Sequence, residues 1–264
     1  GASVSILDFG GIITRIQVPD RGGKLGDVCL GFADALAYTA DSGSMGALIG
    51  RVGNRIGGSR FTLNGQTYPL TPNNGPNNLH GGPEGFNLRM WQVAPVQGDG
   101  VDALHLTLVS PDGDQGFPGE LTVRVTYTFD EHNALGIDYH ATTTKATLVN
   151  LTNHAYFNLD GCDGPDIRGL ELQVLADAVC EAGPGLIPTG KLIPQAEVPY
   201  DFATPRRLGD VLAHTDANPA MKAANGVDFN YCAGFDRAWK HMASLDSPAT
   251  GREKRVMTDM PGVQ

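Results

Sequence analysis

A strict alternation of apolar and polar side chains between residues 120 and 143 constrains the fold more than any other feature of the sequence. Apolar residues recur at every second position from Leu121 to Phe129, with threonines and an arginine between them. After a polar turn at residues 130–133 the alternation resumes through residues 135–141. Side chains of a strand point alternately to its two faces, so this pattern predicts a long antiparallel hairpin with one buried face.

Shorter segments along the chain carry the same pattern of a half-buried strand. Between two of them stands Asn64-Gly65, a dipeptide that supplies the two positive φ angles of a tight hairpin turn. Strands are therefore expected along the whole length of the chain. The shorter segments are residues 60–63, 66–69, 104–108 and 170–174.

Helical patterning is scarce. It is limited to residues 33–38 and 218–224, where Pro219 suits the first position of the second helix. The sequence shows neither a repeat at the periods of propellers or solenoids nor a Pro-, Ser- and Gly-rich linker. We therefore predict one all-β domain over residues 1–264, a large antiparallel β-sandwich with minor short helices.

Charge and composition exclude several classes of partner. The 264 residues carry 19 Lys and Arg against 29 Asp and Glu, a net charge of −10, which has the wrong sign for binding nucleic acid. The sequence has no apolar run that could cross a membrane. Cys29, Cys162, Cys180 and Cys232 are far apart and lack zinc-site spacing, so free thiols in a reducing compartment are expected.

Three polar clusters in Gly- and Asn-rich segments are candidates for binding a small polar ligand. The first, residues 50–56, holds Arg51, Asn54 and Arg55. Their side chains can donate several hydrogen bonds to hydroxyl groups; the alternative is a structural arginine that binds loop carbonyls. The second cluster places His80 in front of two glycines, where an imidazole either reaches a cleft or only satisfies a turn.

The third cluster, residues 150–159, has the strongest indication of function. In a strand, Thr152, His154 and Tyr156 would project from one face, and the residues between them from the other. A polar stripe that faces the interior of a curved sheet is costly unless a ligand or a partner satisfies it. We therefore interpret this stripe as part of a binding surface.

Taken in chain order, seven segments resemble motifs of the aldose 1-epimerase (galactose mutarotase) family. Seven colinear motifs make the resemblance specific and extend it over essentially the whole chain. It implies a galactose mutarotase-like supersandwich that interconverts the α and β anomers of free aldoses, using no metal and no nucleotide. The segments are Val18-Pro-Asp-Arg21, residues 46–56, Asn78-Leu-His-Gly-Gly82, residues 112–119, residues 150–159, Ile187-Pro-Thr-Gly190 and Pro261-Gly-Val-Gln264.

The resemblance also implies roles for individual residues. His154 matches the family's general acid, which protonates the ring oxygen while a carboxylate takes the proton of the C1 hydroxyl. An imidazole, with an ordinary pKa of about 6.5, suits proton exchange near neutral pH. His80 is expected to help polarise the ring oxygen as well. The residues that match sugar-binding positions of the family are Asn54, Arg55, His80, Tyr156, Asp228 and Gln264.

Two departures from the family pattern leave an alternative open. Phe229 stands where the family usually has a His, and the family's general base is a Glu that lies beyond the position of Gln264. Members also have at least one more strand ahead of residues 3–18, so we expect the sequence to be part of a longer protein. The alternative is a carbohydrate-binding β-sandwich that lacks the base. In either case a cytoplasmic monomer or homodimer that binds a small aldose is expected, with neither nucleic acid nor membrane as a partner.

Overall fold

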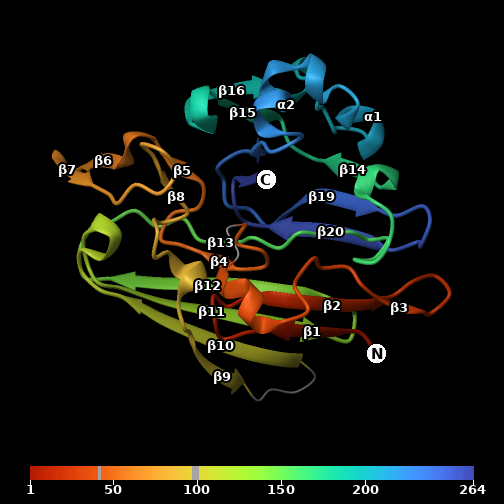
Figure 1. The fold of residues 1–264 in the computed structure, drawn as a ribbon, viewed down its shortest axis with the longest axis horizontal. Helices are drawn as coiled ribbons and strands as arrows, with labels where there is room; N and C mark the ends of the chain where they lie inside the picture. Colours follow the sequence, from red (N-terminus) through yellow and green to blue (C-terminus); the bar gives the residue numbers. More distant parts are fainter. Residues whose placement is uncertain (41–42, 97–100) are drawn as a thin grey trace. The chain divides into compact units, whose positions relative to one another are not determined.

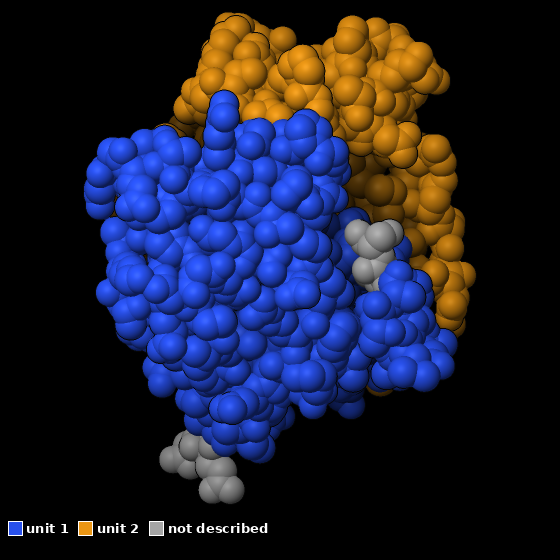
Figure 2. Space-filling model, turned by 60° about the vertical axis from the view of Figure 1, so that its left-hand side comes forward, with its two compact units in different colours: residues 1–18, 29–157 blue, residues 19–28, 158–264 orange. Residues whose placement is uncertain are grey.

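The computed structural model describes residues 1–40, 43–96 and 101–264, and antiparallel strands dominate them (Figure 1). The predicted all-β class with short helices is confirmed. The chain divides into two compact units, coloured separately in Figure 2: unit 1 comprises residues 1–18 and 29–157, and unit 2 comprises residues 19–28 and 158–264. A single domain over the whole chain stays a prediction.

The predicted hairpin is the centre of the main sheet of unit 1. Its two strands pair antiparallel in unbroken register. The turn is closed by Asp130, whose carboxylate accepts hydrogen bonds from the backbone amides of His132 (2.9 Å) and Ala134 (2.8 Å). The sheet has the order β12-β11-β10-β9 (Figure 1). Its strands are β9 (Gln92–Val96), β10 (Val101–Ser110), β11 (Leu121–Asp130) and β12 (Leu135–Thr143).

One face of this sheet forms the core of unit 1. The alternate residues Leu121, Val123, Val125 and Tyr127 are at most 2% exposed, as the alternation predicted. The Tyr127 hydroxyl donates a hydrogen bond to the carbonyl of Gly11 at 3.0 Å. Gly11 lies between β1 (Ser3–Ile6) and β2 (Ile13–Pro19), which pair antiparallel. The second layer of unit 1 therefore includes this hairpin.

Short strand pairs complete unit 1. Asn64 and Gly65 have φ angles of 52° and 80° and join β6 to β7, as predicted for a tight hairpin. Two further pairs, β4 with β13 and β5 with β8, connect segments that are distant in the sequence. The strands are β4 (Leu48–Ile49), β5 (Arg55–Ile56), β6 (Arg60–Leu63), β7 (Gln66–Pro69), β8 (Asn78–Leu79) and β13 (Thr152–Asn153).

Unit 2 contains two antiparallel sheets, with the orders β17-β14-β19-β20 and β16-β15-β18-β21. In its core the buried Tyr231 donates a hydrogen bond to the carbonyl of Tyr200 at 2.7 Å, and the Tyr200 ring stacks on Phe229. Phe229 is thus a packing residue. The strands of these two sheets are β14 (Glu171–Val174), β15 (Ala178–Ala182), β16 (Pro188–Pro194), β17 (Arg206–Arg207), β18 (Tyr231–Cys232), β19 (Lys240–Asp246), β20 (Glu253–Thr258) and β21 (Gly262–Val263). The short strand β3 (Leu25–Asp27) belongs to neither of them.

The helices are short. The prediction over residues 218–224 is confirmed by α2 (Pro219–Ala224), whose N-cap Asn218 accepts a hydrogen bond from the Met221 amide at 3.0 Å. The segment predicted over residues 33–38 is instead a 3-10 helix, η1 (Ala35–Ala40). The five residues of α1 (Leu208–Leu212) are too few to show helical periodicity and were not predicted. No helix within the described ranges is long and apolar enough to span a membrane.

Candidate active site

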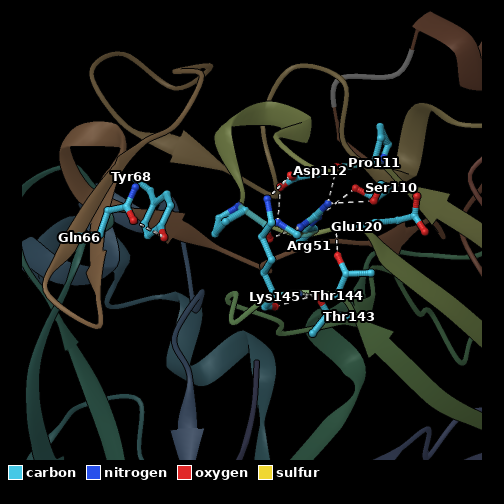
Figure 3. A network of polar contacts seen from close by, with 12 residues as sticks. Arg51, Gln66, Tyr68, Ser110, Pro111, Asp112, Glu120, Thr143, Thr144 and Lys145 are labelled. Atoms are coloured by element: carbon cyan, nitrogen blue, oxygen red, sulfur yellow. Dashed lines mark hydrogen bonds and ion pairs between the residues drawn. The ribbon is translucent and has the colours of Figure 1, made fainter.

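The two arginines of the first polar cluster have different roles. Arg51 is only 2% exposed, and its guanidinium donates hydrogen bonds to the Ser110 hydroxyl (2.9 Å) and to the carbonyls of Ser110, Pro111 and Pro118 (2.8–3.1 Å; Figure 3). Burial lowers the pKa of Arg51, although Asp114 nearby acts in the opposite direction. Arg51 is therefore the structural arginine that the sequence left open, and it holds three loop carbonyls.

Arg55, in contrast, is oriented by side-chain amides. Its Nε donates to Oδ1 of Asn74 and its Nη1 donates to Oδ1 of Asn54, both at 3.2 Å. Asn73 makes two hydrogen bonds with the backbone of Leu79 (2.7 and 2.9 Å) and so holds the preceding loop against β8. Sequence reasoning missed Asn73 and Asn74. The signal available was a pair of asparagines shortly before the segment that contains His80.

His80 is held by the backbone of Asn54. The pairing of β5 with β8 places Arg55 opposite Leu79, so Asn54 and His80 are neighbours at the end of the ladder. The His80 amide donates to the Asn54 carbonyl, and the Asn54 amide donates to Nδ1 of the His80 ring, both at 3.0 Å. Both residues have positive φ angles, 63° and 54°. Their unusual backbone conformation thus serves a ring-to-backbone contact.

This contact fixes the tautomer of the His80 ring. A backbone N–H only donates, so the ring nitrogen that faces it, Nδ1, must carry a lone pair and accept. The proton of the neutral His80 ring therefore resides on Nε2. The other edge of the ring is a hydrogen-bond donor, which suits contact with a sugar oxygen.

His154 follows β13, which pairs with β4. Its amide donates to the carbonyl of Ala47 (2.8 Å), and its carbonyl accepts from the amide of Gly46 (2.9 Å). The neighbouring Asn153 side chain donates to the Gly46 carbonyl (2.9 Å) and to the hydroxyl of the buried Tyr127 (3.2 Å). Asn153 therefore points into the core of unit 1, as the expected alternation requires. The strand itself is shorter than expected, because only residues 152–153 pair with β4.

The second and third polar clusters meet at three rings. The His154 ring centroid lies 5.2 Å from that of His80, with the rings nearly perpendicular, and 5.0 Å from that of Tyr156. His154 is half-buried, and Tyr156 is 41% exposed. Among the residues that the structure describes, no group forms a hydrogen bond with the ring nitrogens of His154. The cluster presents polar ring edges at the surface of unit 1, as a small polar ligand requires.

The remaining two predicted site residues belong to unit 2. Both side chains are exposed, and Nε2 of Gln264 donates a hydrogen bond to Oδ1 of Asp228 at 2.5 Å. The pairing of β21 with β18 brings them together, since Gln264 directly follows β21 and Asp228 lies three residues ahead of β18. A carboxylate held by an amide retains further acceptor positions for hydroxyl groups.

Comparisons with known proteins identify the family. The family model described as aldose 1-epimerase matches residues 1–264. A galactose mutarotase from Sus scrofa is 40% identical over 261 residues, which are 99% of this chain and 73% of the relative. An aldose 1-epimerase from Escherichia coli K12 is 41% identical over 264 residues, 100% of this chain and 75% of the relative.

Comparison with solved structures indicates the same family. The crystal structure of an aldose epimerase homologue from C. elegans superimposes with a TM-score of 0.85 at 30% identity, covering 99% of this chain and 77% of that one. The predicted galactose mutarotase-like fold is thereby confirmed. With motifs, sequence and fold in agreement, the chain belongs to the aldose 1-epimerase (galactose mutarotase) family of isomerases.

Proposed function

We propose that this protein interconverts the α and β anomers of free aldoses, with His154 as the general acid. One observation supports this role above all others: the half-buried His154 ring lies 5.2 Å from the His80 ring and 5.0 Å from the Tyr156 ring. Two imidazoles so close together can both donate hydrogen bonds to one oxygen atom of a sugar. A proton carrier must be accessible to its substrate and held in a fixed place, and the backbone contacts of His154 provide the second condition.

Ring opening requires one proton to be delivered and one to be removed. His154 gives its proton to the ring oxygen as the C1–O5 bond breaks, while a carboxylate takes the proton of the C1 hydroxyl. The products are an aldehyde at C1 and a hydroxyl at C5. Rotation about C1–C2 exposes the other face of the aldehyde, and the same steps in reverse close the ring as the other anomer. The family resemblance assigns the base to a Glu that follows the position of Gln264.

His80 has a separate task in this scheme. With its proton on Nε2, it donates a hydrogen bond to the ring oxygen and stabilises the charge that develops there. Its Nδ1 is occupied by the Asn54 amide, so it cannot exchange protons through that atom without breaking this contact. The family resemblance matches His154 to the general acid, and His80 then serves as the fixed donor.

The other predicted residues bind hydroxyl groups. In unit 1, Arg55 and Asn54 offer a pre-oriented set of donors, because Asn54 and Asn74 hold the Arg55 guanidinium in place. In unit 2, Asp228 accepts hydrogen bonds from vicinal hydroxyls, as carboxylates do well, and Gln264 orients it. Hydroxyl-binding residues of this kind discriminate between epimers through the hydroxyls that they leave unpaired.

The activity is tested by polarimetry of the full-length protein. Freshly dissolved α-galactose, α-glucose and α-xylose each drift slowly in optical rotation, and the protein should bring at least one of them rapidly to its equilibrium rotation. Sugar binding by calorimetry without any acceleration would contradict the proposal. That result would support the alternative, a carbohydrate-binding β-sandwich without the base.

A further inference from the structure

Two cysteines of unit 2 lie in direct contact. Cys180 is on β15 and Cys232 is on β18, and these strands pair antiparallel with Val179 opposite Tyr231. The two Sγ atoms are 3.4 Å apart. Both thiols are free, and no atom fits between two sulfur atoms at this separation.

The amide of Asn230 binds both sulfur atoms. Its Nδ2 lies 3.4 Å from Sγ of Cys180 and 3.4 Å from Sγ of Cys232. The Asn230 carbonyl also accepts a hydrogen bond from the Cys180 amide at 2.8 Å. A single side chain thus contacts both thiols and holds them beside each other.

The two thiols differ in accessibility. Cys232 is 5% exposed, whereas Cys180 is half-buried and reachable from solvent. Burial, followed by the contact with Cys180, raises the pKa of the Cys232 thiol to about 12. Cys180 is therefore the sulfur that meets an oxidant, and Cys232 is positioned to react with it afterwards.

We propose that Cys180 and Cys232 are a modification site, a dithiol that hydroperoxides convert to a reversible disulfide. A disulfide bond is about 2.05 Å long, so the two sulfur atoms, 3.4 Å apart, must approach by about 1.4 Å. Neither cysteine has a role in the proposed sugar chemistry, and no family motif in the sequence contains them.

The reaction balances with peroxide as the oxidant. The Cys180 thiolate attacks one oxygen of hydrogen peroxide, forming an S–O bond as the O–O bond breaks, and the released hydroxide takes up the thiol proton as water. The Cys232 sulfur then attacks the Cys180 sulfur, the S–O bond breaks, and a second water leaves. Two thiols lose two electrons in total, and one peroxide is reduced to two waters.

The disulfide would form beside the sugar-binding residues of unit 2. Asn230, which binds both sulfur atoms, is two residues after Asp228, and β18 also pairs with β21, which ends next to Gln264. Oxidation removes the two thiols that Asn230 contacts and cross-links β15 to β18. Resting on the proposed function, we infer that oxidation weakens sugar binding and raises the KM for the aldose severalfold.

The modification is tested by mass spectrometry of the full-length protein after treatment with hydrogen peroxide. Remaining thiols are blocked with N-ethylmaleimide under denaturing conditions, and the digest should contain a cross-linked pair of peptides with Cys180 and Cys232. Dithiothreitol should restore both thiols. The Cys162→Ser variant, which lacks an exposed cysteine, should form the same link, and Cys180→Ser should not.

Two results would overturn the inference. If Cys180 and Cys232 are both blocked by N-ethylmaleimide after oxidation, or if Cys180 is linked to a different cysteine, the pair is not a disulfide site. If the link forms but the KM of oxidised protein equals that of reduced protein, the coupling to sugar binding is wrong. The mass readout does not depend on catalysis, so an inactive protein would contradict the proposed function and leave the disulfide test intact.

Discussion

At the scale of single residues, hydrogen bonds from the backbone decide what each imidazole can do. The Asn54 amide donates to Nδ1 of His80 at 3.0 Å, so we expect His80 to be the Nε2–H tautomer. Long-range 1H–15N NMR correlation spectra distinguish the two tautomers directly. His132, in the exposed turn between β11 and β12, serves as the comparison, because its Nδ1 faces a carboxylate oxygen of Asp130 at 3.9 Å and not a backbone amide. A His80 ring protonated only on Nδ1 would contradict this assignment.

A second prediction at this scale concerns Arg51. Replacing it with Met keeps most of the side-chain volume but removes the donor to the Ser110 and Pro118 carbonyls. The Pro111 carbonyl keeps a hydrogen bond from the Asp114 amide at 3.1 Å, and the Ser110 hydroxyl keeps its bond to the Asp114 carboxylate. Each buried polar group left unsatisfied costs about 1–3 kcal/mol, so the loss of the donor to these two carbonyls in Arg51→Met should lower the free energy of unfolding by about 2–6 kcal/mol. Urea denaturation measures this loss.

The matched control for Arg51 is Arg60, an exposed arginine of the same unit. Arg60→Met should change stability by no more than about 0.5 kcal/mol. Equal stability losses in the two variants would show that the buried contacts of Arg51 are not a main support of the fold. The proposed sugar donor is Arg55, so folded Arg51→Met protein should retain its turnover.

At the scale of strands and turns, the alternation of apolar and polar residues predicted strands whose pairing stays regular along their length, and it did not predict the others correctly. The alternation along β11 and β12 runs unbroken and predicted their pairing and their buried face. Residues 150–159 pair with different partners in succession: Thr152 and Asn153 with β4, then Phe157 with Cys29. No periodicity in one segment reveals such a change of partner, and the predicted strand was therefore too long.

The turn between β6 and β7 offers a test at this scale. Gly65 has φ of 80°, and a Cβ added there would meet no atom within 4 Å. Gly65→Ala should therefore lower stability by about 1 kcal/mol through backbone conformation alone. The control is Asn64→Gly, because glycine also tolerates the positive φ of 52° at this position. Thermal unfolding of the two variants compares them, and an unchanged midpoint for Gly65→Ala would contradict the assigned turn.

At the scale of the whole molecule, the sequence predicted the fold class and the family, and less of the site. The family resemblance singled out His80 and His154. It did not reveal that the Asn54 amide binds the His80 ring, that Asn74 binds Arg55 or that Asn73 binds the backbone of Leu79. The reason is physical: these contacts depend on β5 pairing with β8, two residues each, and on β4 pairing with β13. Pairings this short between distant segments leave no periodic signal in the sequence.

The most direct measurement of the proposed chemistry is the turnover number of His154→Ala in the full-length protein, followed by polarimetry with a freshly dissolved α-aldose. Loss of a general acid should lower kcat by about 10²–10⁴-fold, with an unchanged circular dichroism spectrum. His132→Ala, in the exposed turn, should retain the kcat of the unmodified protein. A His154→Ala protein that is folded and turns over within about threefold of the unmodified protein would contradict the assignment of His154 as the proton donor.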